Sequence, residues 1–226
     1  MRVLPPTPAA WRGTPVARLT TALPDLLLSA GFLITWIAPL TLDEKAVSYF
    51  LLVMLLEFLI VHSAGFMGSV VLHRPLATGF KVRALAGLGG FYLLFAAGFA
   101  LGFRAWWPIW TILGLTLNRI LIVLLGEIPD GKERQSIQKG WAASTLFYVV
   151  LALLTVLLPV PALGVTAQVI DLQAFTSTGL WVDEPQRVLA FGFLYFLATG
   201  ASELVSHRWL PDASIPSAAP SVGVSS

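Results

Sequence analysis

The stretch AVSYFLLVMLLEFLIVHSAGFMGSVVL, residues 46–72, decides the fold, because it is an apolar run that only Glu57 and His62 interrupt with groups able to carry charge near neutral pH. A helix needs about 20 residues to cross the hydrocarbon core of a bilayer, which is about 30 Å thick. The run therefore predicts a membrane-spanning helix that is long enough to tilt. It also raises the question of function, since a charged side chain in that core costs about 3 kcal/mol or more.

The composition of the whole chain supports a membrane protein. Of its 226 residues, 57% are apolar and only 12% are charged, against about 25% charged in soluble domains. The net charge is only +2 and the basic residues lie in short segments between apolar runs, so no nucleic-acid partner is indicated. The chain has no cysteine, which excludes disulfides, thiolate zinc sites and iron–sulfur clusters. The expected partner is the lipid bilayer, and no cofactor is indicated.

Six segments approach or exceed the length of a membrane span. They lie near residues 22–40, 46–72, 84–103, 107–126, 141–159 and 186–206. We therefore expect an all-α, polytopic bundle of six transmembrane helices over residues 21–210, preceded by a flexible cytoplasmic arm over residues 1–20. Apolar residues at helical spacing within residues 163–176 predict a short interfacial helix on the outer face. The Ser- and Pro-rich residues 211–226 predict a disordered cytoplasmic tail.

The distribution of Lys and Arg predicts the orientation in the membrane. With a cytoplasmic N-terminus, ten basic residues fall on the cytoplasmic side and three on the outer side, while Arg119 falls inside a span. Cytoplasmic loops carry the excess of Lys and Arg, so both termini are predicted to be cytoplasmic in a multi-pass protein of the cell membrane, the inner membrane if the source is bacterial. The cytoplasmic set is Arg2, Arg12, Arg18, Arg74, Lys81, Arg83, Lys132, Arg134, Lys139 and Arg208; the outer set is Lys45, Arg104 and Arg187.

Small residues predict where the helices pack, because they let helix backbones approach closely in lipid. The segment 84–103 is rich in Gly and Ala and is expected to be the central helix. Ala64 and Gly68 follow Glu57 at helical spacing, which places all three on one face directed into the bundle. A second inward-facing stripe is predicted at Thr111, Gly114 and Asn118.

The polar residues inside the predicted spans supply the candidate site. Counting about 1.5 Å per helical residue, Arg119 lies at about the depth of His62 and within side-chain reach of the level of Glu57. We therefore predict an ion pair between Glu57 and Arg119, across the second and fourth spans, with Asn118 and His62 close by. This cluster is either a structural clamp whose charges satisfy one another or a polar pathway.

His62 belongs to a different helix face from Glu57, because the two are five residues apart. It shares its face with Phe66, Ser69 and His73, and this stripe leads toward the cytoplasm and could relay protons. The structural alternative is a histidine that forms a hydrogen bond with a neighbouring serine or a backbone carbonyl.

Glu203 and His207 are the candidates for a metal site, because a carboxylate and an imidazole four residues apart share a helix face. The preferred interpretation is a solvated helix end at which the histidine complements the helix dipole. The sequence contains no zinc-hydrolase, phosphate-loop or dinucleotide-binding motif.

Three classes of function fit these residues. The first is transport, or proton- or ion-coupled passage of a small solute, in which Glu57 titrates, Arg119 supplies the counter-charge or binds an anion, and His62 accepts protons. The second is a membrane-embedded hydrolase or lipid-modifying enzyme, metal-dependent or not, whose site Glu203 and His207 would complete. The third is a structural or assembly protein in which the cluster only clamps helices. We expect the first, while the substrate and the oligomeric state are not indicated.

Overall fold

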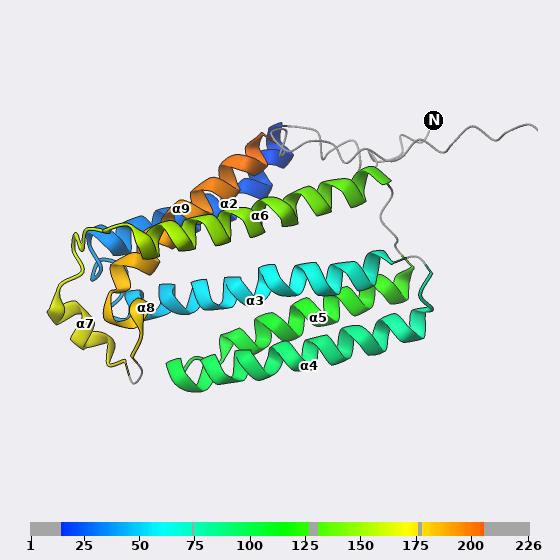
Figure 1. The fold of residues 1–226 in the computed structure, drawn as a ribbon, viewed down its shortest axis with the longest axis horizontal. Helices are drawn as coiled ribbons and strands as arrows, with labels where there is room; N and C mark the ends of the chain where they lie inside the picture. The colour runs from blue at the N-terminus through cyan, green and yellow to red at the C-terminus, as the bar shows by residue number, and fades with distance from the viewer. Residues whose placement is uncertain (1–14, 74, 127–130, 176–177, 206–226) are drawn as a thin grey trace, which may run out of the picture.

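The computed structural model describes residues 15–73, 75–126, 131–175 and 178–205, apart from the side chains of residues 132, 133 and 136. These residues form helices and no strand (Figure 1). Six of the described helices are long and apolar enough to cross a membrane, which confirms the predicted all-α fold with six such helices. They are α2 (Pro15–Ile37), α3 (Ala46–Leu72), α4 (Thr78–Phe103), α5 (Trp107–Leu125), α6 (Gly131–Leu157) and α9 (Pro185–Leu204).

Several helix ends follow from the local sequence. Pro108 and Pro185 stand in the first turns of α5 and α9, where the missing backbone N–H has no helical partner to lose. Gly126 follows α5 in the left-handed conformation with a φ of 71°, which glycine adopts without steric cost.

The start of α2 corrects the predicted N-terminal arm. The helix begins at Pro15, so residues 15–20 are helical rather than flexible. The physical reason is that proline is well suited to the first position of a helix, which the prediction overlooked. The rest of the predicted arm, residues 1–14, and the predicted tail, residues 211–226, lie outside the described residues.

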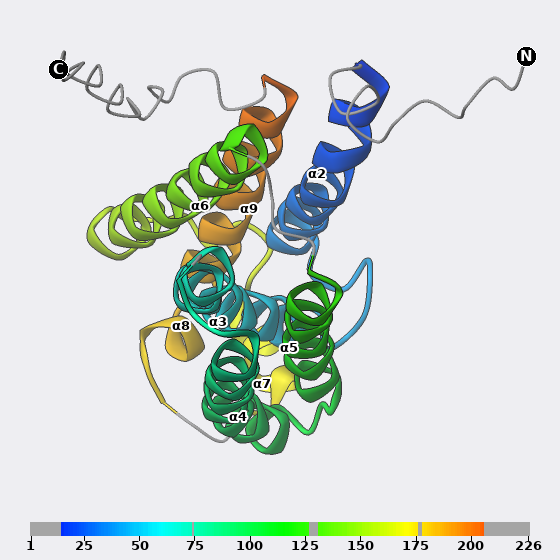
Figure 2. The ribbon, with the colours of Figure 1, turned by 90° about the vertical axis from the view of Figure 1, so that its right-hand side faces the viewer.

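Successive membrane-length helices alternate in direction, so the bundle has two ends (Figure 1). We call them the Ala46 end, where α3 begins, and the Leu72 end, where α3 ends. Between them α3 occupies the centre: it contacts α2, α4, α5, α6 and α9. Figure 2 shows α3 between the group of α2, α6 and α9 and the pair of α4 and α5.

The prediction that residues 84–103 form the central helix is wrong. α4 packs mainly against α5 and α3, and much of its Gly-rich surface faces outward. A Cβ atom added at Gly89 would lie 2.3 Å from Cγ2 of Thr116, so this glycine does permit a close approach to α5. A Cβ atom added at any other glycine of this segment would meet no atom within 4 Å; these glycines are Gly87, Gly90, Gly98 and Gly102. A count of small residues therefore could not identify the central helix, because it does not show which of them face a neighbour.

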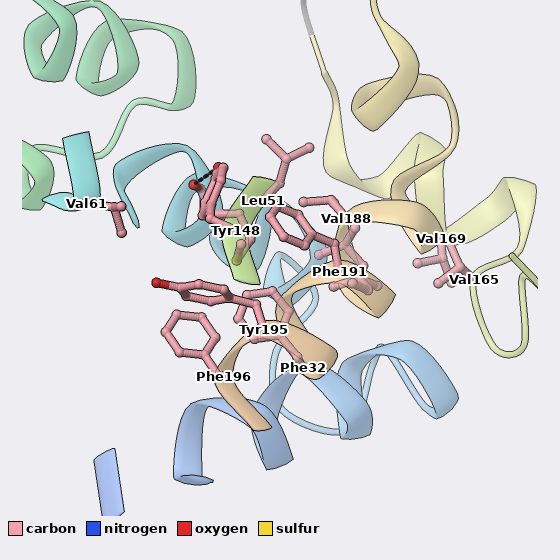
Figure 3. Close-up of a cluster of buried hydrophobic side chains, with 13 residues drawn as sticks. Phe32, Leu51, Val61, Tyr148, Val165, Val169, Val188, Phe191, Tyr195 and Phe196 are labelled. Carbon is pink, nitrogen blue, oxygen red and sulfur yellow. Dashed lines mark hydrogen bonds between the residues drawn. The ribbon is translucent and has the colours of Figure 1, made fainter. Parts of the chain in front are cut away.

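An aromatic core fills the Ala46 half of the bundle, where α3 meets α2, α6 and α9 (Figure 3). Its principal members are Phe32, Leu51, Met54, Tyr148, Phe191, Tyr195 and Phe196, all buried. The rings of Phe32 and Phe196 stack with centroids 5.6 Å apart. Gly192 permits a close approach of α9 to α2, since an added Cβ there would lie 2.2 Å from Cε1 of Phe32. The contact between α2 and α9 at Gly192 thus has no room for a further side chain.

A connector with two short helices, α7 (Ala167–Gln173) and α8 (Leu180–Asp183), covers the Ala46 end (Figure 1). The predicted interfacial helix over 163–176 is therefore shorter than expected, and α8 was not predicted. The side-chain amide of Gln173 holds α7 against the start of α3: it donates to the Glu44 carbonyl at 2.8 Å and accepts from the Ser48 amide at 3.0 Å.

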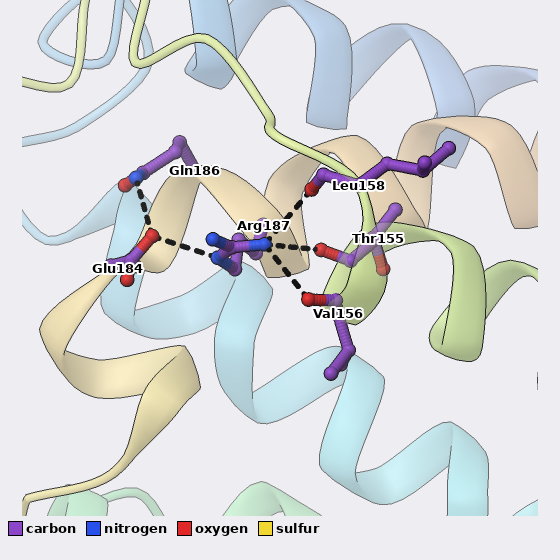
Figure 4. Close-up of polar contacts among 6 residues, drawn as sticks. All are labelled: Thr155, Val156, Leu158, Glu184, Gln186 and Arg187. Carbon is purple, nitrogen blue, oxygen red and sulfur yellow. Dashed lines mark hydrogen bonds and ion pairs between the residues drawn. The ribbon is translucent and has the colours of Figure 1, made fainter.

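Arg187 closes the Ala46 ends of α6 and α9 (Figure 4). Its Nη1 donates to the carbonyls of Thr155, Val156 and Leu158 at 2.9, 3.1 and 3.0 Å, and its Nε donates to Glu184 at 2.7 Å. The last carbonyls of a helix have no helical partner, so a guanidinium among them is favourable. From the sequence, Arg187 was predicted only to lie on the outer side.

Candidate functional site

A cavity of about 380 Å³ lies between α3, α5 and α6 at the level of Glu57, midway along α3. Its polar wall consists of two charged side chains, Glu57 and Arg119, and the hydroxyl-bearing Ser144. The rest of the wall is formed by Ile60, Val61, Ala64, Gly68, Val71, Leu72, Ile122, Ile137 and Trp141. Small-molecule sites have this character, with volumes of about 300–1,000 Å³, mostly apolar walls and a few polar groups.

A second cavity of about 360 Å³ continues from the first toward the Leu72 end. The two cavities share Ala64, Gly68, Leu72, Ile137 and Trp141, so they form one groove, which we call the α3–α6 groove. The remaining wall of the second cavity consists of Gly65, Ser69, His73, Arg134 and Gln138. The groove thus leads from polar side chains at the Leu72 end to Glu57 and Arg119 at mid-helix.

Trp141 and two small residues give the groove its shape. A Cβ atom at Gly65 would lie 2.7 Å from Cζ2 of Trp141, so this glycine makes room for the indole. A Cβ atom added at Gly68, one turn further along α3, would meet no atom within 4 Å, because this position faces the open groove. The predicted face of Glu57, Ala64 and Gly68 does run along one wall, and that wall is open rather than packed.

Two hydrogen bonds from α6 to carbonyls of α3 set the width of the groove. Trp141 Nε1 donates to the Val61 carbonyl at 3.0 Å, and Tyr148 Oη donates to the Met54 carbonyl at 3.0 Å. The donors are seven residues apart on α6 and the acceptors seven apart on the antiparallel α3, so the helices keep one register over two turns. Ser144 lies between the two donors and lines the cavity.

Glu57 has a partner that the sequence analysis did not identify. Tyr195 Oη of α9 donates to Glu57 Oε1 at 2.6 Å, a short bond typical of a phenol and a carboxylate. Ser144 lies beside the same phenol, and Asp25 of α2 is close enough to interact electrostatically with Glu57. Glu57 therefore lies between the aromatic core and the cavity, held by α9 rather than by α5.

Arg119 lines the same cavity but does not form the predicted ion pair with Glu57. Its Nη1 donates to the Ser63 carbonyl at 2.7 Å, and it interacts electrostatically with Tyr92 of α4. Within the described residues no carboxylate lies within 4.0 Å of the guanidinium. The prediction was wrong because it matched the two residues by depth alone, whereas Tyr195 directs the Glu57 carboxylate toward α9.

His62 faces α4 and the outer surface of the bundle. Its Nδ1 lies 2.8 Å from Tyr92 Oη, and its ring packs against Phe58 and Phe66 with centroids 5.6 and 4.8 Å away. The predicted alternative of a serine or carbonyl partner is thus replaced by a tyrosine. Tyr92 also interacts electrostatically with Arg119, and His62 does not line the cavity that holds Glu57.

Asn118 was predicted to join the cluster, but its side chain is exposed on the outer surface of α5. Gly114, on the same predicted stripe, is also exposed and has open space beside it. The stripe faces outward because α5 presents Ile112 and Thr116 to the neighbouring helices instead. Helical spacing identified the stripe correctly, but it does not indicate which of two opposite faces is buried.

The metal candidates are not brought together with the cluster. Glu203 lies near the Leu72 end of α9 and interacts electrostatically with Asp25, whereas His207 lies outside the described residues. Among the residues whose positions are described, no three His, Asp or Glu side chains converge as metal ligands would.

Three tyrosines carry the polar contacts of this region, and all three were missed. Tyr92, Tyr148 and Tyr195 are buried, and each hydroxyl has a partner. A signal was available, since the chain contains 14 Phe and only 4 Tyr. A tyrosine inside an apolar span therefore indicates that its hydroxyl has a partner there.

The described part of the chain is all-α, with six helices long and apolar enough to span a membrane and a mid-helix cavity whose mostly apolar wall carries Glu57, Arg119 and Ser144. Comparison with protein-family models, with curated proteins and with solved structures finds no match. The groove itself is accordingly the basis for inferring what the protein does.

Proposed function

We propose that this chain is a multi-pass membrane protein that takes a small solute or ion into the α3–α6 groove and passes it across the membrane, coupled to protons or ions. One observation carries the proposal: Glu57 and Arg119 line one cavity without pairing with each other. Both lie in helices of membrane length. Charged groups at that depth are costly and are kept mainly where they serve a polar pathway.

The proposed orientation makes the Leu72 end cytoplasmic, with both termini on that side. Among the described residues Arg18, Lys81, Arg83, Arg134 and Lys139 belong to this end, which is the excess that cytoplasmic segments carry. The groove would then be reached from the cytoplasm past Arg134. On the other side of Glu57 the aromatic core fills the bundle, so passage to the outer face requires α6 and α9 to move relative to α3.

The test is transport by purified protein in vesicles that contain a pH-sensitive dye. We expect protein-dependent proton movement with at least one impermeant solute from a panel of carboxylates, sulfonates, amines and sugars. Gly68→Leu should abolish this movement by filling the groove, because the added side chain meets open space. Gly98→Leu is the matched control, since Gly98 has equally open surroundings on the outward face of α4. Equal rates in wild-type protein, Gly68→Leu and empty vesicles would contradict the proposal.

A structural clamp remains a second candidate because Glu57 and Tyr195 join α3 to α9 through a 2.6 Å hydrogen bond. In a dry clamp, Tyr195→Phe leaves a buried carboxylate without a donor, which costs about 3 kcal/mol. In a groove that admits water, the carboxylate is solvated and the loss is about 1 kcal/mol. Unfolding of Tyr195→Phe in detergent therefore separates the two candidates, with Tyr148→Phe as the reference for losing one phenol in the same core.

A further inference from the structure

The chemistry of the groove wall limits what it can hold. Around the cavity, nine of the twelve lining residues are apolar or glycine, and only Glu57, Arg119 and Ser144 offer polar groups. A sugar or another solute with many hydroxyls would leave most of its polar groups without partners on such a wall. An amphiphile with one polar head and an apolar body could place its head at the few polar side chains and its body against the apolar wall. The volume of about 380 Å³ suits a molecule with a single ring or a short chain.

The sign of the polar head follows from the contacts of the two charged residues. The Glu57 carboxylate already accepts the Tyr195 phenol. Arg119 has five N–H donors, and one of them is used in its bond to the Ser63 carbonyl. Its guanidinium lines the cavity with no carboxylate within 4.0 Å among the residues that the structure describes. The missing partner is therefore an anion.

We infer that the solute is a small amphiphilic carboxylate whose carboxylate binds Arg119 and whose apolar body lies against Ile60, Ala64 and Ile122 in the α3–α6 groove. A planar guanidinium and a carboxylate match in geometry and can form two parallel hydrogen bonds. This assignment rests on the proposed function for its route of entry. It names the substrate class of the same cavity.

Glu57 couples this anion to protons. Four groups from four helices face it or share its cavity: Asp25 of α2, Arg119 of α5, Tyr148 of α6 and Tyr195 of α9. An anion beside an ionised Glu57 is repelled strongly in a medium of low dielectric constant. Occupancy of the cavity by a carboxylate therefore favours a neutral, protonated Glu57, so that anion and proton are taken up together.

The experiment measures binding of three matched probes to purified full-length protein in detergent. Benzoate, benzylammonium and benzyl alcohol share a ring and differ in the charge of the head. We expect benzoate to bind at least about tenfold more tightly than either of the others, because a charge-assisted hydrogen bond is worth about that factor. Inorganic phosphate, an anion without an apolar body, should bind more weakly than benzoate.

Variants assign the binding to Arg119. Arg119→Gln should weaken benzoate binding by about tenfold or more, while Arg119→Lys retains part of it. Asn118→Ala, one position away on the exposed face of α5, is the matched control and should bind as the wild type does. The affinity of the wild-type protein for benzoate should fall as the pH rises, because an ionised Glu57 repels the bound carboxylate. In Glu57→Gln this fall should be lost.

The outcomes separate this inference from the proposed function. Preference for benzylammonium or for benzyl alcohol by the wild-type protein overturns the inference, and this comparison needs no variant to fold. Equal benzoate binding by Arg119→Gln and the wild type also overturns it. Selective benzoate binding without protein-dependent uptake of the impermeant analogue benzenesulfonate into vesicles would leave the anion site intact and overturn transport.

Discussion

The two halves of α3 are both apolar in sequence, but one half is closely packed and the other lines a groove. From Ala46 to Met54 one face of the helix packs against rings from α2, α6 and α9. From Glu57 to Leu72 it forms one wall of the α3–α6 groove, with Arg119 opposite. Both halves read as apolar sequence. The difference lies in how closely the neighbouring helices pack against α3: their rings fit tightly against it in one half, and in the other half α5 and α6 leave a cavity beside the small residues Ala64 and Gly68.

Two glycines, one in each half of the bundle, show the same difference in packing. In the packed half a Cβ atom added at Gly192 would clash with the Phe32 ring, whereas in the open half one added at Gly68 would meet no atom within 4 Å. Glycine permits close packing in the first case and leaves space for a ligand in the second. Paired substitutions that affect both halves alike would contradict this difference, whereas substitutions that affect only one half would support it.

The largest expected effect is that of Gly192→Leu, which should lower the free energy of unfolding by about 3 kcal/mol through overpacking against the buried Phe32. Gly68→Leu, the matched substitution in the groove, should change it by less than about 1 kcal/mol. Thermal unfolding of both variants in the same detergent measures the difference. Equal losses would mean that the groove is closed in the protein as purified.

The next effect concerns the Ala46 end of the packed half. Arg187→Ala should lower the free energy of unfolding by about 2–3 kcal/mol, since three helix-end carbonyls lose a charged donor. Glu184→Gln keeps those three bonds and weakens only a half-exposed ion pair, so it should cost less than about 1 kcal/mol. Denaturation of the two variants side by side checks the order, and the reverse order would remove Arg187 as the cap of α6.

A smaller effect is expected where the two halves meet. Tyr148→Phe removes the bond to the Met54 carbonyl and should cost about 1 kcal/mol, since that carbonyl has a helical partner as well. Solute uptake should fall much less than in Gly68→Leu, because Tyr148 helps to set the width of the groove but does not line the cavity. Unfolding and vesicle uptake of the same preparation measure both. An uptake loss as large as that of Gly68→Leu would show that the aromatic core is part of the pathway.

The smallest effect has the opposite sign. Gly68→Ala should raise the free energy of unfolding by about 0.5–1 kcal/mol, because alanine is the better helix former and its methyl group meets no atom. Gly89→Ala is the control in a packed position, where the new methyl would clash with Thr116. It should be destabilising or neutral. A loss for Gly68→Ala as large as for Gly89→Ala would contradict the open wall.

The sequence predicted the class of the fold because span length and charge are properties of single segments. Glu57, Ala64 and Gly68 were also placed correctly on one face, since a helix repeats every 3.6 residues. Partners could not be predicted in the same way. Which side of α5 is buried, and whether Glu57 meets Arg119 or Tyr195, depends on which helices are adjacent. The depth of a residue within its helix limits which residues can be its partners, but it does not identify the partner.

The most direct test of the account is the accessibility of single cysteines, because the chain contains none of its own. In vesicles of known orientation, Ala64→Cys and Gly68→Cys should react with a charged, impermeant methanethiosulfonate reagent added at the proposed cytoplasmic face, the Leu72 end. Ala190→Cys, buried in the packed half, and Gly98→Cys, on the outward face of α4, should not react. If neither Ala64→Cys nor Gly68→Cys reacts, or if they react only with reagent added at the opposite face, the α3–α6 groove is not open to the proposed cytoplasmic side.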